Sequence, residues 1–352
     1  MTQETILEAR GLTAGYRPPG RPMVRVVEGV DERLYSGELV CLIGPNGAGK
    51  STLLRTIAGM QPALDGGVLV RGQDINQMRA DERARLLSIV LTQKMDVGLF
   101  TGYGLVSLGR HPYTGWMGRL TETDHVIIRE SIRMVGAQDL AGRHFNTMSD
   151  GERQKIMIAR ALAQQPEVMI LDEPTAYLDL PRRVEVMYLL RDLAHRTGRT
   201  ILLSTHDLEL ALRSADRLWL LPAAGPMQVG VPEDLVLSGA FQTVFESAGV
   251  HFDITTGAFR RDQQITRPVT LKGEGVQHLW TRRALEREGF DVCKPGETDL
   301  LQIVIDVDHD GGTCWWVIDD ETRIACDSIS ALTACVRARL QARARTDSCA
   351  AD

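Results

Sequence analysis

Short, continuously apolar runs alternate with helical patterns through the first two-thirds of the chain. The strand-like runs cover residues 39–43, 168–171 and 200–204. The helical patterns cover residues 50–59, 154–163 and 184–194. Apolar runs of this length are typical of strands buried on both faces, and strands that alternate with helices form parallel sheets. The pattern therefore predicts an α/β fold with a central parallel sheet covered on both sides.

Other parts of the chain follow different patterns. Residues 1–35 and 60–75 indicate antiparallel strands and turns, and residues 95–165 indicate mostly helix and loop. Beyond about residue 250, the pattern predicts a small α+β unit with strands and helices at 269–272, 278–288, 301–307, 314–318 and 328–342. We therefore expect two domains, residues 1–250 and residues 251–352, as suits a chain of 352 residues.

Composition narrows the classes of function. Forty Lys and Arg residues against 46 Asp and Glu give a net charge of -6, which argues against a surface built to bind nucleic acid. No stretch approaches the roughly 20 apolar residues of a membrane span, and residues 1–5 do not begin a signal peptide. The six cysteines form no C-x-x-C pair, which favours free thiols over a metal site. We expect a cytoplasmic protein that reaches a membrane only by docking on a partner.

The most specific chemical motif directly follows the first apolar run. It matches G-x-x-x-x-G-K-[ST] and lies between a predicted strand and a predicted helix. Its residues are Gly44, Pro45, Asn46, Gly47, Ala48, Gly49, Lys50, Ser51 and Thr52. Its glycines let backbone N–H groups surround phosphate, and the following helix adds its positive end. Lys50 is expected to reach the β- and γ-phosphates of a nucleoside triphosphate, and the Ser51 hydroxyl to ligate Mg²⁺. The motif predicts a P-loop NTPase.

Two carboxylates follow the apolar run at 168–171. Asp172 and Glu173 stand at the end of that predicted strand, and ligands of α/β sheets bind at the carboxyl ends of strands. Asp172 is expected to hold Mg²⁺, and Glu173 to polarise the attacking water. Alone, the pair would indicate an ordinary turn, but beside a P-loop it indicates the second half of a nucleotide site.

A third motif narrows the class of NTPase. Ser149 precedes a predicted helix and Glu152 follows three residues later, which forms a capping box. With Gly151 between them, and placed shortly before the strand that ends at Asp172, the segment resembles the signature motif of the ATP-binding-cassette (ABC) ATPases. Further family motifs follow the expected order and are matched by Tyr16 for the adenine-stacking aromatic, Gln93 for the Q-loop, Asp179 for the D-loop and His206 for the switch histidine.

The resemblance covers about residues 5–225 and implies a fold and a mechanism. The implied fold is a RecA-like parallel sheet with an antiparallel β subdomain and a helical subdomain. It also implies that two copies pair head to tail, so that Ser149 and Gly151 of one chain close over ATP bound to the P-loop of the other. His206 would contact the γ-phosphate, Gln93 would contact Mg²⁺, and Asp179 would cross the interface.

The helical zone points to a subclass. Residues 109–113, Asp124 and the run from Thr175 to Asp179 resemble the ATPases of bacterial importers for iron–siderophore, haem and cobalamin complexes. The resemblance implies integral-membrane permease subunits as direct partners at the cytoplasmic face of the membrane. A substrate-binding protein would be an indirect partner. The alternatives are a non-transport ABC ATPase acting on DNA or ribosomes and, further away, a metabolic P-loop kinase.

The C-terminal unit carries no decisive motif. Residues 306–311 begin like an EF-hand loop, but position twelve is Val317 rather than Glu, so a β-hairpin is the better interpretation. Trp315 and Trp316 are neighbours on a predicted strand and point to opposite faces, so we expect one of the two rings in a core. The role of the unit remains open between regulation, a dimer contact and stabilisation.

Overall fold

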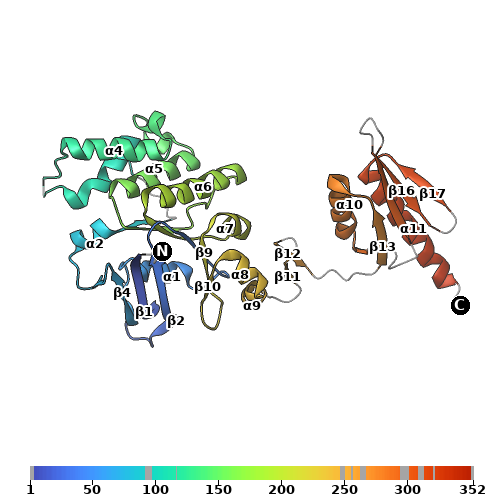
Figure 1. The fold of residues 1–352 in the computed structure, drawn as a ribbon, viewed down its shortest axis with the longest axis horizontal. Coiled ribbons are helices and arrows are strands. Elements are labelled where there is room, and N and C mark those ends of the chain that lie inside the picture. The colour runs from blue at the N-terminus through green and yellow to red at the C-terminus, as the bar shows by residue number, and fades with distance from the viewer. Residues whose placement is uncertain are drawn as a thin grey trace. The chain divides into compact units, whose positions relative to one another are not determined.

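The computed structural model describes residues 4–91, 97–115, 117–245, 250–254, 257–261, 267–293, 301–307, 313–319 and 322–349. The chain forms two compact units, Met1–Phe259 and Arg260–Asp352 (Figure 1). Within the described residues, no helix is long and apolar enough to cross a bilayer.

A six-stranded sheet forms the centre of the first unit. Its strands, in spatial order, are β10 (Gln228–Gly230), β9 (Arg217–Leu220), β3 (Leu39–Ile43), β8 (Thr200–Ser204), β7 (Val168–Asp172) and β6 (Leu87–Val90). All neighbouring pairs are parallel except the one between β9 and the edge strand β10. The predicted parallel sheet is thus confirmed, with its three apolar runs as central strands.

Apolar side chains cover both faces of this sheet. Along β3, Leu39, Cys41 and Ile43 belong to one buried cluster, while Val40 and Leu42 belong to another. The helices after the strands are α1 (Lys50–Ile57), α6 (Leu180–Thr197), α7 (Leu208–Ser214), α8 (Pro232–Leu237) and α9 (Ala240–Phe245). Because successive strand residues point to opposite faces, a continuous apolar run is what a sheet covered on both sides requires.

Two subdomains flank the central sheet. The antiparallel one has the spatial order β2 (Val24–Tyr35), β1 (Thr5–Tyr16), β4 (Asp65–Val70) and β5 (Gln73–Asp74). The helical one contains α2 (Ala80–Leu86), α3 (Gly102–Ser107), η1 (Leu108–Tyr113), α4 (Glu122–Met134), η2 (Gln138–Leu140), η3 (Phe145–Thr147) and α5 (Asp150–Ala163). In Figure 1, β1, β2 and β4 lie at one end of this unit and α4 and α5 at the other. After α9, the chain forms the hairpin of β11 (Val250–Asp253) and β12 (Ala258–Arg261).

The second unit is a five-stranded mixed sheet with two helices. Its spatial strand order is β14 (Phe290–Cys293), β13 (Arg267–Lys272), β15 (Gln302–Val307), β16 (Thr313–Ile318) and β17 (Arg323–Cys326), and its helices are α10 (Gly275–Arg287) and α11 (Ile329–Cys349). Trp315 is buried in its core, as the alternation predicts. Strands β15 and β16 pair antiparallel up to Val307 and Thr313, as expected for a hairpin, and its turn at 308–312 lies outside the described residues.

Candidate functional site

The P-loop lies between β3 and α1, and its glycines are sterically required. A side chain at Gly49 would be strained at a φ of 101° and would bring its Cβ to 2.5 Å from Val26 Cγ1. A Cβ at Gly44 would lie 2.2 Å from the carbonyl oxygen of Leu221. Helix α1 has no side-chain cap and no acidic residue in its first turn. Its N-terminal N–H groups and positive dipole end are therefore available to an anion.

Lys50 is held inside this loop. Its side chain is buried, and its Nζ donates to the carbonyl oxygens of Gly44 at 2.8 Å and Pro45 at 3.0 Å. Burial lowers the pKa of Lys50, opposed by the carboxylates of Glu173 and Asp172. A cation that has lost part of its hydration and bonds only to neutral carbonyls gains strongly from an incoming phosphate.

The Asp172 carboxylate accepts hydrogen bonds from two neighbouring hydroxyl groups. Its Oδ1 accepts from Ser51 Oγ at 2.9 Å and from Ser204 Oγ at 2.8 Å. Asp172 and Ser204 stand opposite each other in the parallel pair of β7 and β8, and both are buried. The end of β7 therefore brings the P-loop hydroxyl and a carboxylate to one point, as the motifs predict.

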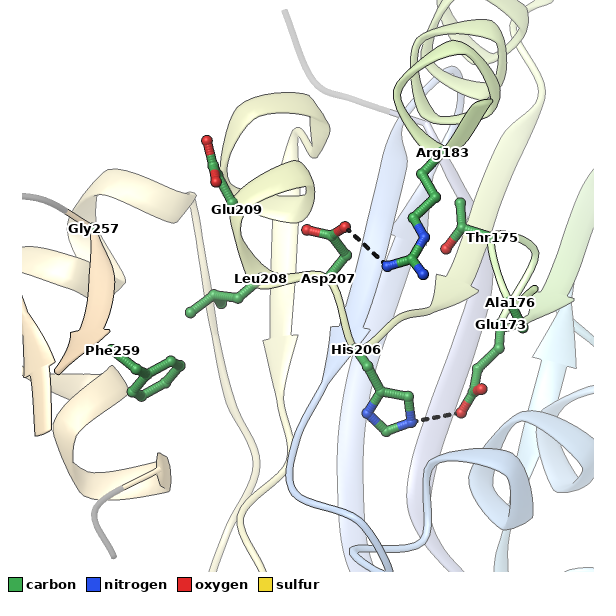
Figure 2. A pocket seen from close by; sticks show the side chains of 10 residues that line it. All are labelled: Glu173, Thr175, Ala176, Arg183, His206, Asp207, Leu208, Glu209, Gly257 and Phe259. Atoms are coloured by element: carbon green, nitrogen blue, oxygen red, sulfur yellow. Dashed lines mark hydrogen bonds and ion pairs between the residues drawn. The ribbon is translucent and has the colours of Figure 1, made fainter. Parts of the chain in front are cut away.

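Glu173 and His206 meet directly (Figure 2). Glu173 Oε1 and His206 Nε2 lie 2.6 Å apart, and both side chains are partly exposed. The backbone N–H of Glu173 donates to Ser204 Oγ at 3.0 Å, and its φ of 49° is unusual for a residue other than glycine. Backbone strain of this kind costs about 1–3 kcal/mol and persists only where the surroundings enforce it. The backbone of Glu173 is thus fixed next to Asp172, and the negative charges of both carboxylates act on Lys50.

A cavity of about 470 Å³ opens beside this pair. Figure 2 shows that Glu173 and His206 border one side and that Phe259, from strand β12, stands at the other. Its remaining lining residues are Thr175, Ala176, Arg183, Asp207, Leu208, Glu209 and Gly257. The Glu173 carboxylate is therefore accessible from this cavity.

The other motif residues lie at two further places. The Tyr16 hydroxyl is 2.7 Å from Thr52 Oγ1, so its half-exposed ring lies beside the P-loop helix. Ser149 is exposed at the start of α5 and forms the expected capping box with Glu152. Asp179 caps α6 by accepting from the Arg182 N–H at 3.0 Å. Gln93 lies outside the described residues.

Sequence reasoning missed Ser204, whose hydroxyl joins Asp172 and the backbone of Glu173. The available signal was its position at the carboxyl end of a predicted strand, two residues before His206. Arg110 and Asp124, which belong to the segments that resemble importer ATPases, form a buried ion pair. Arg110 Nε donates to Asp124 Oδ1 at 2.8 Å, and both side chains are buried in the helical subdomain.

Comparisons with known proteins agree with this geometry. Residues 27–176 match the family model for the ABC transporter, and residues 266–337 match that of the iron ABC transporter C-terminal domain. An uncharacterized ABC transporter ATP-binding protein of Methanocaldococcus jannaschii is 43% identical over 72% of this chain and 86% of its own length. The achromobactin transport ATP-binding protein of Dickeya dadantii is 37% identical over 68% of this chain and 88% of its own.

Solved structures show the same likeness. A dimeric bacterial ABC transporter cassette superposes with a TM-score of 0.56 at 27% identity and covers 64% of this chain and 99% of its own. A post-hydrolysis state of that cassette, bound to ADP and phosphate, matches equally well. Both comparisons concern the first unit, which contains the site described above.

Proposed function

The chain belongs to the ATP-binding proteins of ABC transporters, and from this premise we propose that it is the ATP-hydrolysing subunit of an importer whose cargo is an iron–siderophore complex. The relatives named for achromobactin transport and for iron(3+)-hydroxamate import support this cargo, the latter at 34% identity over 88% of its length. The match of residues 266–337 to an iron transporter domain supports it independently. A cobalamin import relative is 35% identical, so cobalamin, like haem, is a cargo to test.

The P-loop and Tyr16 are proposed to bind ATP. The backbone N–H groups of residues 46–49 and the uncapped start of α1 would surround the phosphates, and Lys50 would exchange its two carbonyl acceptors for phosphate oxygens. The ring of Tyr16 would stack on adenine, anchored by its hydroxyl on Thr52. The observation that carries this proposal is the convergence of Lys50, Ser51, Asp172 and Glu173 at one end of the sheet.

The residues around Asp172 fit Mg²⁺. The Ser51 hydroxyl and the Asp172 carboxylate already contact each other, and both are oxygen ligands of the kind that Mg²⁺ takes. No group of three or more His, Cys, Asp or Glu side chains in the described part of the chain suits a metal ion. Phosphoryl-transfer sites typically hold Mg²⁺ with few protein ligands and complete its shell with phosphate and water. When bound there, Mg²⁺ neutralises charge on the phosphate oxygens. Gln93 is proposed as a further ligand.

Glu173 and His206 are proposed to carry out the hydrolytic step. Glu173 would orient and polarise the attacking water, because in phosphoryl transfer positioning and charge stabilisation supply most of the catalysis. His206, 2.6 Å from that carboxylate, would contact the γ-phosphate. In the hydrolytic arrangement, Glu173 would exchange its contact with His206 for one with water.

Dimerisation is proposed to complete the site. Ser149 is exposed at the start of α5, and we propose that it contacts, together with Gly151 and Glu152 of the same turn, ATP held by a second copy. Asp179, which caps the start of α6, is proposed to cross the same interface. Permease subunits would dock on the helical subdomain at the cytoplasmic face of the membrane, and a substrate-binding protein would deliver the cargo to them.

Reconstitution with the permease that co-purifies with this chain tests the proposal. Proteoliposomes that hold the complex should accumulate a ⁵⁵Fe-labelled siderophore with ATP, and a complex carrying Lys50→Ala should not. Uptake of cobalamin or haem instead would refute the iron–siderophore cargo. Co-purification of ribosomes or DNA without any permease would favour the non-transport alternative.

A further inference from the structure

Arg183 joins two loops that meet at the proposed catalytic pair. It is the fourth residue of α6, and its Nε donates to the carbonyl oxygen of Leu178 at 2.8 Å. Its Nη1 lies 3.9 Å from Asp207 Oδ2, an ion pair drawn as a dashed line in Figure 2. Leu178 ends the loop that begins at Glu173, and Asp207 directly follows His206. One guanidinium therefore contacts both the glutamate loop and the histidine loop.

The glutamate loop holds unusual backbone geometry. Two consecutive turns shape it, with Ala176 N–H bonded to the Glu173 carbonyl at 3.0 Å and Leu178 N–H bonded to the Thr175 carbonyl at 3.3 Å. Glu173 has a φ of 49° and Tyr177 a φ of 65°, so neither end of the loop is relaxed. Such strain requires surrounding contacts that maintain it. The bond from Arg183 to the Leu178 carbonyl is one of them.

The histidine loop is anchored through Asp207. The Asp207 carboxylate caps α7 by accepting from the Leu210 N–H at 3.1 Å, and its own N–H donates to Thr205 Oγ1 at 3.0 Å. Its other carboxylate oxygen faces Arg183. Because His206 lies between Thr205 and Asp207, these contacts fix the backbone from which its imidazole projects.

We propose that Arg183 is a positioning residue. By bridging the Leu178 carbonyl and the Asp207 carboxylate, it keeps the loops that carry Glu173 and His206 at a fixed position relative to each other. The guanidinium is suited to this because it is permanently charged and planar, so that its Nε can donate to the Leu178 carbonyl while its Nη1 attracts the Asp207 carboxylate. Arg183 lines the cavity beside the pair, and its hydrogen bond and ion pair go to Leu178 and Asp207, so we infer that it acts on the reaction through the two loops. The inference rests on the proposed ATPase function of the same site.

Steady-state ATPase kinetics of Arg183→Gln test the proposal. We expect kcat to fall about ten-fold, because small displacements of catalytic groups have effects of this size or larger. The KM for ATP should stay unchanged, since the P-loop and Tyr16 are untouched. Arg191→Gln is the matched control, because Arg191 also joins α6 to α7, through a 3.4 Å bond to the Arg213 carbonyl at the far end of α7. Its kcat should stay within about two-fold of wild type.

A double-mutant cycle separates positioning from general stabilisation. Asp207→Asn keeps a side chain that caps helices well but removes the charge that faces Arg183. If the bridge acts as a unit, Asp207→Asn should lower kcat in the same direction, and the double variant should be no slower than the slower single variant. Additive losses, or a normal kcat in Arg183→Gln beside a lowered melting temperature, would overturn the inference alone. A wild-type protein without ATPase activity would overturn the proposed function and the inference together.

Discussion

The buried pair of Arg110 and Asp124 offers the most quantitative test of the fold. Asp124 Oδ1 accepts from Arg110 Nε, and Oδ2 accepts from the N–H and the hydroxyl of Thr121. Burial alone would raise the pKa of Asp124, but these bonds and the Arg110 charge outweigh it and bring the pKa to about 2 from an ordinary value of 3.8. A difference of this size corresponds to roughly 2.5 kcal/mol in favour of the ionised folded state.

Replacing Asp124 by Asn should remove most of that stabilisation. Both carboxylate oxygens face donors, so the amide NH₂ of Asn must meet either Arg110 or Thr121 with donor against donor. We expect the free energy of unfolding at pH 7 to fall by about 2–4 kcal/mol and the melting temperature by about 5–12 °C. Urea unfolding and calorimetry measure both quantities.

The pH dependence has a definite sign. Because the pKa of Asp124 is lowered by folding, its contribution is fully present above the unfolded value near 3.8 and is lost as the pH falls toward 2. The difference between wild type and Asp124→Asn should therefore be constant from pH 7 to about 5 and shrink below that. Glu122→Gln on the same helix is the control, since its exposed pair with Arg129 is worth at most about 1 kcal/mol. Equal stability of wild type and Asp124→Asn would refute the reasoning.

Three further outcomes follow from the structure. Gly49→Ala should abolish ATP binding, measured by titration calorimetry, because the new Cβ collides with Val26 at a strained φ; binding as tight as that of the wild type would contradict this. Cys41 should resist iodoacetamide in the folded protein and react only in denaturant, because burial and then the Asp216 charge raise its thiol pKa; labelling of the native protein, read by mass spectrometry, would disprove it. Deleting residues 262–352 should leave the specific ATPase activity within about two-fold of wild type, since the site lies in the first unit, and loss of activity in a folded truncation would assign the second unit a part in the site.

The central strands and the phosphate site were predictable from sequence because each has a local cause. A continuous apolar run can be satisfied only by burial on both faces, and β3, β7 and β8 follow those runs within one residue. The P-loop glycines are required by the conformation of their own loop, and the capping box of Ser149 and Glu152 spans only four residues. Both therefore leave a local sequence pattern. Strand β14 and strand β17 were not predicted. Both lie at the edges of the second sheet, where one neighbouring strand and a short length leave little pattern.

The contacts that sequence could not predict join distant segments. Ser204 reaches Asp172 across 32 residues of sequence, and Arg110 reaches Asp124 across 14. The contacts of Arg183 could not be predicted either, since an arginine in the first turn of a helix is ordinarily a solvated surface residue. These three contacts depend on which strands and helices become neighbours, and that is a property of the completed fold.

The mass of a Glu173→Gln variant in solution tests the central claim most directly. Without its carboxylate the protein should bind Mg-ATP and fail to hydrolyse it, so that two copies stay closed over two nucleotides. Light scattering after size exclusion should give about twice the 38.9 kDa chain mass with Mg-ATP and the single mass with ADP or no nucleotide. An unchanged mass in saturating Mg-ATP, with ATP binding confirmed, would contradict the account.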